Sequence, residues 1–284
     1  MTDKIIALVD GSIYSASVCD HAAWIAGRTG APVELLHVLG RREGVEKADL
    51  SGSIRLGART ALLEELAELD AQRARLVAHR GRAILEDARA ILDKAGVTEI
   101  TTRLRHGDIV ETVAEQEKDA GLILIGKRGE AADFARGHLG SNLERIVRAS
   151  RKPVFVASRA FRPIGKVLVA WDGGTSAMRA VDHIARNPLY AGLTVHVVTV
   201  GSATAEVKKG LEDARALLQA GGIAAETAVL PGQPETALGK LVDEAGFDIL
   251  VMGAYGHSRI RSLIIGSTTT EMIRSCKVPV VLVR

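Results

Sequence analysis

Short apolar runs alternate along this chain with longer segments of helical periodicity. The runs are rich in Val, Ile and Leu and lie at residues 4–9, 33–38, 122–126, 153–156, 167–171, 195–200, 249–253 and 279–283. Runs that are apolar throughout are typical of strands buried on both faces of a parallel sheet. Strands that alternate with helices at this spacing predict an α/β fold with helices on both faces of the sheet.

The chain repeats itself. Five features recur in the same order: residues 5–11 with 167–173, 33–38 with 195–200, 122–126 with 249–253, a Gly-Ser helix start at 140–141 with 266–267, and a Pro-led final strand at 153–156 with 279–283. Such order indicates a duplication. Residues 158–165 have the composition of a linker, so we expect domains at 1–158 and 165–284. Each is predicted to be a doubly wound, Rossmann-like, five-stranded parallel sheet.

The first half carries an insertion between its second and third strands. Residues 41–57 are polar and contain glycine, which predicts a mobile loop. Residues 58–95 are predicted to be helical, with an approximate apolar stripe, and Gly81 is a candidate break. The stripe consists of Leu62, Leu66, Leu69, Leu76, Ile84, Ala88 and Ile91. Two interpretations remain open: a long helix that covers the sheet, or a helix that binds a partner or a second copy.

Composition narrows the classes of function. Only 3% of residues are aromatic and the net charge is +3, which argues against a base-stacking or strongly basic nucleic-acid surface. No apolar run approaches the roughly 20 residues of a membrane span, and residues 4–9 enter a strand directly, so we expect no membrane partner and a cytoplasmic location. Cys19 and Cys276 lie far apart, and the histidines show no paired ligand spacing, so we expect reduced thiols and no metal site.

A glycine-rich motif in the second half predicts a phosphate site. A strand ends at Gly253, Gly256 follows, and after nine further residues Gly266 and Ser267 open a helix. Glycines let the backbone turn and approach a ligand closely, and the N–H groups at a helix start favour anions. Thr268 and Thr269 add hydroxyl groups, and the intervening loop carries His257, Arg259 and Arg261, which are able to reach outer phosphates.

Asp172 follows the first strand of the second half. In a doubly wound sheet, that strand end and the end at Gly253 flank the switch point where ligands bind. Asp172 could accept hydrogen bonds from a ribose or hold a metal near phosphate, or it could simply stabilise the turn into a helix. No Ser–His–Asp set, Cys–His set or Walker pattern stands out, so we nominate no catalytic residue and expect no enzyme.

The motif Gly253-x2-Gly256-x9-Gly266-Ser267 resembles the ATP-binding motif of the universal stress protein family, spacing included. The Asp172-Gly173 strand end and the final strand are also similar, and the resemblance covers the chain twice, as in a tandem family member. The resemblance implies that Asp172 contacts the nucleotide, Val200 touches adenine and residues 253–269 hold phosphates. The candidate ATP site, with Mg²⁺ as an optional companion, comprises Asp172, Val200, Met252, Gly253, Tyr255, Gly256, His257, Gly266, Ser267, Thr268 and Thr269.

The first half departs from the motif. Gly126 and Gly129 are present, but ten residues separate Gly129 from Gly140, and Glu130 and Asp133 enter that loop. Asn142 stands where the second half has Thr268, whereas Asp10 and Val38 keep their places. Two carboxylates would repel a triphosphate at short range, so we expect an altered site with weak binding or none.

The resemblance also implies that family domains pair through their final strands. We expect residues 153–157 and 279–283 to pair with each other inside one chain as a pseudo-dimer, and whole chains to associate further as a homodimer through helices. Our main hypothesis is an ATP-binding regulatory or stress-response protein. The alternatives are a nucleotide-dependent enzyme of the same broad fold and a structural interaction module whose glycines only make turns.

Overall fold

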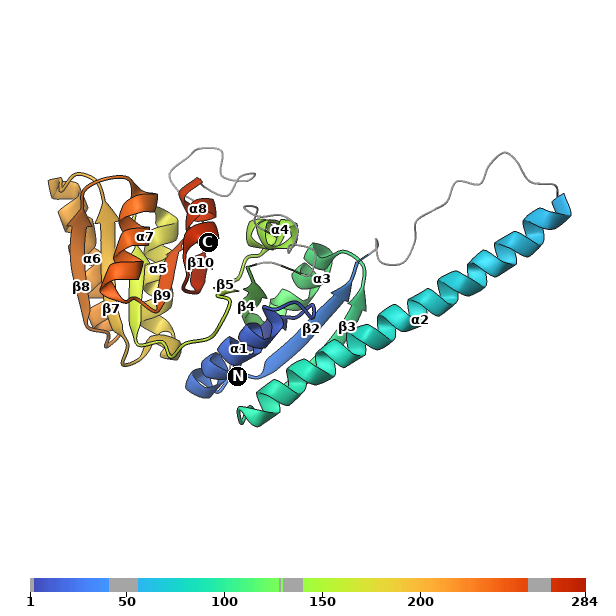
Figure 1. Cartoon of the computed structure of the whole chain (residues 1–284). Coiled ribbons are helices and arrows are strands. Elements are labelled where there is room, and N and C mark those ends of the chain that lie inside the picture. Colours follow the sequence, from blue (N-terminus) through green and yellow to red (C-terminus); the bar gives the residue numbers. More distant parts are fainter. Residues whose placement is uncertain (1–2, 41–55, 128, 130–139, 255–266) are drawn as a thin grey trace.

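The computed structural model describes residues 3–40, 56–127, 129, 140–254 and 267–284. The first half contains, in chain order, β1 (Lys4–Leu8), α1 (Ser15–Thr29), β2 (Val33–Leu39), α2 (Leu56–Lys94), β3 (Ile100–His106), α3 (Ile109–Gln116), the short helix η2 (Glu117–Asp119), β4 (Ala120–Gly126), α4 (Ser141–Ala149) and β5 (Val154–Ala157). The second half contains β6 (Lys166–Ala170), α5 (Thr175–Arg186), the short helix η4 (Pro188–Tyr190), β7 (Thr194–Val200), α6 (Ala205–Ala220), β8 (Ala225–Leu230), α7 (Pro234–Ala245), β9 (Ile249–Gly253), α8 (Ser267–Ser275) and β10 (Val280–Val283). The two halves thus repeat the same alternation of strands and helices (Figure 1).

The strands of both halves join into one sheet of ten strands, in the order β3-β2-β1-β4-β5-β10-β9-β6-β7-β8. Within each half every pairing is parallel. The chain leaves β1 and β6 in one direction across the sheet and returns to their other side at β4 and β9, which is the doubly wound order. The predicted fold, two tandem doubly wound five-stranded units, is confirmed.

The closing strands β5 and β10 join the two halves. They pair antiparallel, with Val281 opposite Phe155 and Val280 opposite Val156. All four of these side chains are fully buried. The pairing predicted between the final strands is therefore present within a single chain, and it converts two strands that would otherwise be sheet edges into interior strands.

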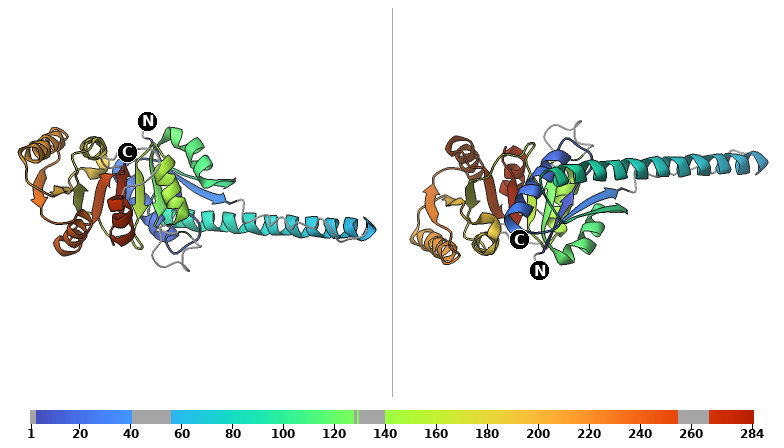
Figure 2. Two further views of the ribbon diagram at one scale, coloured as in Figure 1. Left: turned by 90° about the horizontal axis from the view of Figure 1, so that it is seen from above. Right: turned by 90° about the horizontal axis from the view of Figure 1, so that it is seen from below.

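Two apolar layers cover the sheet, one on each face, and each runs through both halves. Successive strand residues alternate between them: Val167 and Val169 belong to one layer, Leu168 to the other. Helices α1, α2, α5 and α6 contribute to the first layer, and α3, α4, α7 and α8 contribute to the second. Figure 2 shows these helices on the two sides of the sheet. Continuous layers stabilise the two halves as one body.

Polar contacts add to the joint between the halves. Arg28 of α1 donates from Nε to the carbonyl oxygen of Leu189 at 2.7 Å and also donates to the carbonyl of Ala191. Lys127, after β4, donates to the carbonyl of Cys276. Helix α1 therefore docks on the second half as well as on its own sheet.

Helix α2 runs without a break from Leu56 to Lys94, so the suggested break at Gly81 is wrong. The glycine is used for packing instead: a Cβ there would lie 2.8 Å from Leu104 Cδ1 and 3.0 Å from His37 Cδ2. Gly81 thus lets the helix lie close to β2 and β3. The expected loop at 41–57 falls outside the described residues, except for its last two residues, which belong to α2. No helix in the described part of the chain combines the length and apolar character needed to cross a membrane.

Gly210 of α6 and Gly239 of α7 provide a matched test of packing. Each is the sixth residue of its helix. A Cβ at Gly210 would overlap with Cη2 of the buried Trp171, whereas a Cβ at Gly239 would meet nothing within 4 Å. Helix propensity alone favours alanine at both positions.

We expect Gly239→Ala to stabilise the chain by about 0.5–1 kcal/mol. Gly210→Ala should destabilise it by about 1–3 kcal/mol because the Trp171 ring has to move. Urea unfolding of the two variants and the parent measures the change in the free energy of unfolding for each substitution. Equal changes in the two variants would contradict the packing argument.

Candidate functional site

The candidate site lies where β6 and β9 end side by side. Ala170 of β6 is in register with Met252 of β9 in a parallel pairing, so Asp172 and Gly253 follow at the same carboxyl edge. The chain proceeds from β6 to β7 on one side and reaches β9 on the other, which makes this edge the switch point of the second half. The structure therefore brings the two predicted strand ends together.

The Asp172 carboxylate stabilises the turn into α5. Its Oδ1 accepts a hydrogen bond of 2.8 Å from the N–H of Gly174, and Gly173 between them has φ = 77°, in the left-handed region. Asp10 does the same in the first half, where its Oδ1 accepts from the Ser12 N–H at 3.0 Å and the Ser15 hydroxyl at 3.2 Å. A turn-stabilising role for this aspartate is thus observed in both halves.

Gly253 is required by packing. A Cβ on it would lie 2.8 Å from Ser176 Cβ and 3.0 Å from the backbone nitrogen of Ala177. The first turn of α5 therefore sits directly against the end of β9. We expected this glycine to let the backbone approach a ligand; contact with α5 is a separate reason for a glycine at this position.

The remaining strand residues of the candidate set differ in accessibility. Met252 is buried at 6% exposure, in the apolar layer on the α7 and α8 side of the sheet. Val200, the last residue of β7, is half-buried and packs against the same layer. Of these two side chains, that of Val200 is partly accessible and that of Met252 is not.

The start of α8 presents three hydroxyl side chains in different surroundings. Ser267 is exposed, and Thr269 is buried at 4% exposure. Thr268 donates from Oγ1 to Oε1 of Glu235 at 2.6 Å, and this hydrogen bond lowers the pKa of Glu235. Of the three predicted donors, Ser267 alone is exposed.

Sequence reasoning missed Glu235, which stands in the first turn of α7. A signal was available in the chain: Pro234 opens that helix, and in a doubly wound sheet a helix that follows β8 starts at the carboxyl edge. The acidic residue just after this proline was therefore predictable as a neighbour of the α8 start. It places a carboxylate beside the helix terminus that favours anions.

Four members of the candidate set, Tyr255, Gly256, His257 and Gly266, lie outside the described residues, as do Arg259 and Arg261. The sequence motif is thus described only at its two ends, β9 and α8.

The first half shows how a glycine of this motif meets the strand-end aspartate. A Cβ on Gly129 would lie 2.8 Å from Oδ2 of Asp10. Asp10 and the second glycine of Gly126-x2-Gly129 are thus in contact distance. Val38 is half-buried and Asn142 is exposed, whereas Glu130 and Asp133 lie outside the described residues.

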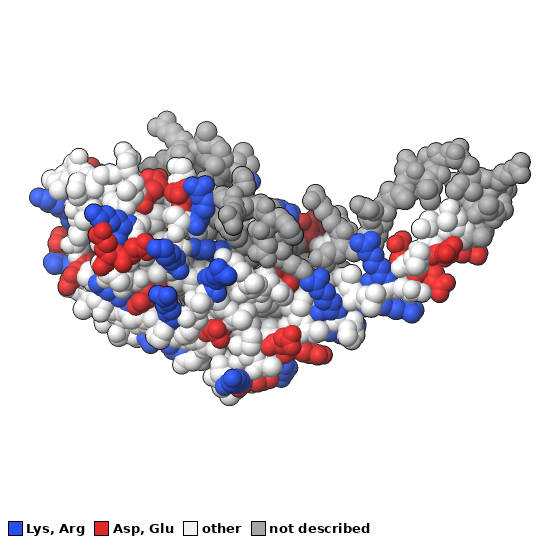
Figure 3. Space-filling view, viewed as in Figure 1, with Lys and Arg blue, Asp and Glu red and all other residues white. Residues whose placement is uncertain are grey.

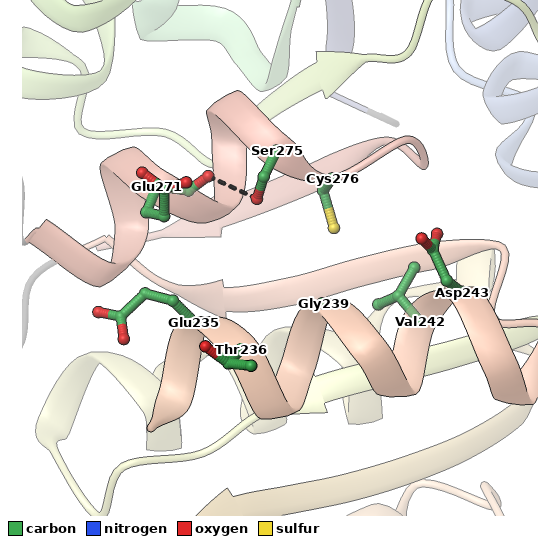
Figure 4. A pocket seen from close by; sticks show the side chains of 8 residues that line it. All are labelled: Glu235, Thr236, Gly239, Val242, Asp243, Glu271, Ser275 and Cys276. Carbon is green, nitrogen blue, oxygen red and sulfur yellow. Dashed lines mark hydrogen bonds between the residues drawn. The ribbon is translucent and has the colours of Figure 1, made fainter. Parts of the chain in front are cut away.

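A pocket lies between α7 and α8, with a volume of about 300 Å³. Figure 4 shows Glu235, Asp243 and Glu271 among the side chains around it. Lys277 pairs with Asp243 and Arg274 with Glu271, at 2.8 Å and 2.5 Å. Glu235 lines this pocket and also accepts from Thr268 at the start of α8, so the pocket begins beside the candidate site and extends along α8 to Ser275 and Cys276.

Comparisons with a family model and with known proteins all point to one protein family. The model of the universal stress protein family matches residues 1–158 and 201–284. The universal stress protein Slr1230 of Synechocystis sp. is 36% identical over 285 residues, which cover 99% of each chain.

Two solved structures share the fold over nearly the whole chain. A universal stress protein from Archaeoglobus fulgidus has 20% identity and a TM-score of 0.74, covering 99% of this chain and 98% of its own. A putative universal stress protein from Pseudomonas aeruginosa has 16% identity and a TM-score of 0.59, covering 99% and 92%. With the family pattern present in both halves and a full-length relative at 36% identity, the chain belongs to the universal stress protein family.

Proposed function

We propose that this chain is an ATP-binding universal stress protein with a regulatory role, and that its second half holds the nucleotide. The observation that carries the proposal is the placement of the two ends of Gly253-x2-Gly256-x9-Gly266-Ser267 on β9 and α8, at the same switch point as Asp172. Ligands of doubly wound sheets bind at this edge. The exposed Ser267 at the start of α8 fits a phosphate oxygen, because a helix start offers free N–H groups.

The two halves are not equivalent in this proposal. The second keeps nine residues between its glycine pairs, and the loop between them carries His257, Arg259 and Arg261. The first has ten residues and adds Glu130 and Asp133. Like charges disfavour a triphosphate near those carboxylates, so binding in the first half is weaker.

The proposed role is binding without rapid turnover. Two of the described polar groups at the edge are already engaged in structure: Asp172 with the Gly174 N–H and Thr268 with Glu235. General acid–base help is typically worth about 10²–10⁴-fold, and it needs a group free to move a proton. Nucleotide occupancy then acts by ordering the site and changing how the chain meets its partners.

Equilibrium dialysis of the full-length chain with labelled ATP, with and without Mg²⁺, tests the proposal. We expect one strong site per chain, and Gly256→Val should weaken binding by at least about tenfold because a branched side chain fills the space near phosphate. Gly129→Val, the corresponding change in the first half, is the matched control and should leave that site intact.

Three outcomes separate the alternatives. Undiminished binding in Gly256→Val would overturn the site assignment. No binding by the parent chain would favour a structural module whose glycines only make turns. Steady phosphate release at about 1–10³ s⁻¹ from the same preparation would favour an enzyme.

Glu235 offers a second, finer test of the same site. Glu235→Gln retains an oxygen that can accept the Thr268 hydroxyl but removes a negative charge beside the α8 start. We expect ATP to bind about two- to fivefold more tightly, and the gain should shrink at high salt. Glu271→Gln, on α8 but paired with Arg274, is the control and should change affinity less. Weaker binding in Glu235→Gln would show that the carboxylate supports the site instead of opposing it.

A further inference from the structure

Helix α2 extends far beyond the sheet that it covers. Its C-terminal part packs on the domain through the buried Gly81, Leu85, Ala88 and Leu92. Residues 62–80 lie N-terminal to this contact, and nearly all of them are exposed or half-buried. At 1.5 Å per residue they form a rod about 28 Å long. Figures 1 and 2 show this rod projecting away from both halves.

A row of leucines follows the projecting rod. Leu62, Leu66, Leu69 and Leu76 are spaced by four, three and seven residues, the spacing of a coiled-coil seam. Leu69 is 54% exposed and Leu76 is 71% exposed. At about 100° per residue this seam lies roughly 110° around the helix from the face that packs on the sheet. The seam is therefore a second apolar face, which is half-buried at Leu62 and Leu66 and exposed at Leu69 and Leu76.

The charges of the rod are divided into two blocks. Its outer part carries Glu64, Glu65, Glu68 and Asp70 without a basic residue between them. Its inner part, from residue 71 to residue 80, carries Arg73, Arg75 and Arg80 and no acidic residue. Figure 3 shows acidic side chains toward the outer end of the rod and basic side chains nearer the domain.

This charge division selects the partner and its direction. Two such rods side by side in parallel would place acid against acid and arginine against arginine, which is destabilising. An antiparallel pair with its two-fold axis near Ala71 places each acidic block against the other rod's arginines. The same register places Leu66 opposite Leu76, and Leu69 opposite the aliphatic stem of Arg73.

We propose that residues 62–80 of α2 bind the same residues of a second copy of this chain as an antiparallel helix pair. The contact is isologous, so it closes at two copies. With the axis near residue 71, the two domains lie at opposite ends of the pair, clear of each other. Burial of the leucine seam drives the association, and the charge blocks set its direction.

Oligomeric state tests whether the contact exists. Sedimentation equilibrium of the full-length chain over a concentration series should give a dimer. Glu64→Lys, Glu65→Lys and Glu68→Lys combined should raise the dimer dissociation constant at least about tenfold, because Asp70 is then the one acidic residue left in each rod and two basic rods repel each other. Glu86→Lys with Asp87→Lys, on the exposed side of the docked part of α2, is the matched control and should leave it unchanged.

A rescue experiment guards against a variant that merely misfolds. Arg73→Glu, Arg75→Glu and Arg80→Glu added to the three lysine changes exchange the blocks and should restore the dimer. A monomeric parent chain, or a dimer that is indifferent to the lysine changes, would overturn the proposal. So would a failure of the exchanged variant to dimerise when circular dichroism shows that it is folded.

Disulfide cross-linking tests the direction of the pair. Cys19 and Cys276 of the parent are both buried, so added surface cysteines report on the rod. Leu66→Cys mixed with Leu76→Cys should give a cross-linked pair made of one chain of each kind. Neither variant alone should cross-link, because equal positions are far apart in an antiparallel pair. Cross-linking of each variant with itself would show a parallel pair and overturn the proposed geometry.

Discussion

Deletion of residues 280–284 is expected to abolish folding of both halves. These residues form β10, which lies between β9 and β5 in the middle of the ten-stranded sheet. All four strand residues are buried, at 0–6% exposure. Losing four buried aliphatic side chains at about 2 kcal/mol each removes about 8 kcal/mol, which is comparable with the whole net stability of a typical domain. The deletion also exposes two unpaired strand edges that favour aggregation.

The measurement is the soluble yield of the truncated chain and its urea unfolding curve. Deletion of Arg284 alone is the control: it removes the Arg284 contact with the Arg148 carbonyl but leaves β10 complete. We expect the control to stay soluble with a small loss of stability. A five-residue truncation that unfolds like the parent would show that the joint between the halves does not depend on β10.

Acid should destabilise the chain through two buried histidines. Burial lowers the pKa of His21 to about 4, against the opposing effect of its hydrogen bond with the Ser17 carbonyl. Burial likewise lowers the pKa of His183 to about 4, against the opposing charge of Asp182. Nε2 of each ring finds no hydrogen-bond partner among the described residues. The folded chain therefore holds both rings neutral.

The sign follows from proton uptake. Between pH about 6.5 and 4 the unfolded chain binds protons on these rings and the folded chain does not, so stability falls as the pH falls through this window. A lowering from 6.5 to about 4 corresponds to about 3 kcal/mol for each ring at the acid end of the window. Above pH 6.5 the effect is absent.

Urea unfolding at several pH values between 7.5 and 4.5 measures the slope. His183→Phe keeps an aromatic ring against Tyr190, whose centroid lies 5.8 Å away, and removes the titrating group. We expect this variant to lose about half of the slope that the two rings produce. His106→Phe, at an exposed position of β3, is the control and should leave the slope as in the parent. An unchanged slope in His183→Phe would contradict the role of burial.

The local sequence pattern predicted strands and helices correctly where one kind of residue dominated a segment. Residues 249–253 and 279–283 were predicted as buried strands and are β9 and β10, with the proline as the residue just before the latter. The helix predicted at 58–95 is Leu56–Lys94. The break predicted at Gly81 was wrong. Helix propensity considers only the helix that contains the glycine, whereas a glycine is needed here because Leu104 and His37 of the neighbouring strands leave no room for a Cβ.

The candidate site was predictable in part. That Asp172 and Gly253 would lie at the same edge of the sheet followed from the doubly wound order, because neighbouring parallel strands end at one edge. Two contacts did not follow from the sequence: the close packing of Gly253 against Ser176, and the hydrogen bond from Thr268 to Glu235. Each joins segments that are distant in sequence. The functional role of the set remains a proposal with the ATP experiments above as its test.

The sequence by itself determined the duplication, the α/β class, the strand and helix positions and the family motif, since each depends on neighbouring residues or on a repeat within the chain. Only the tertiary structure decided that β5 and β10 join both halves into one sheet and that α2 extends beyond the domain with a partly exposed leucine seam. The tertiary structure also decided which glycines are needed for close packing and which polar side chains already form hydrogen bonds within the protein. The reason is physical: burial and hydrogen bonding depend on what a residue meets across space, and residues far apart in the chain supply those neighbours.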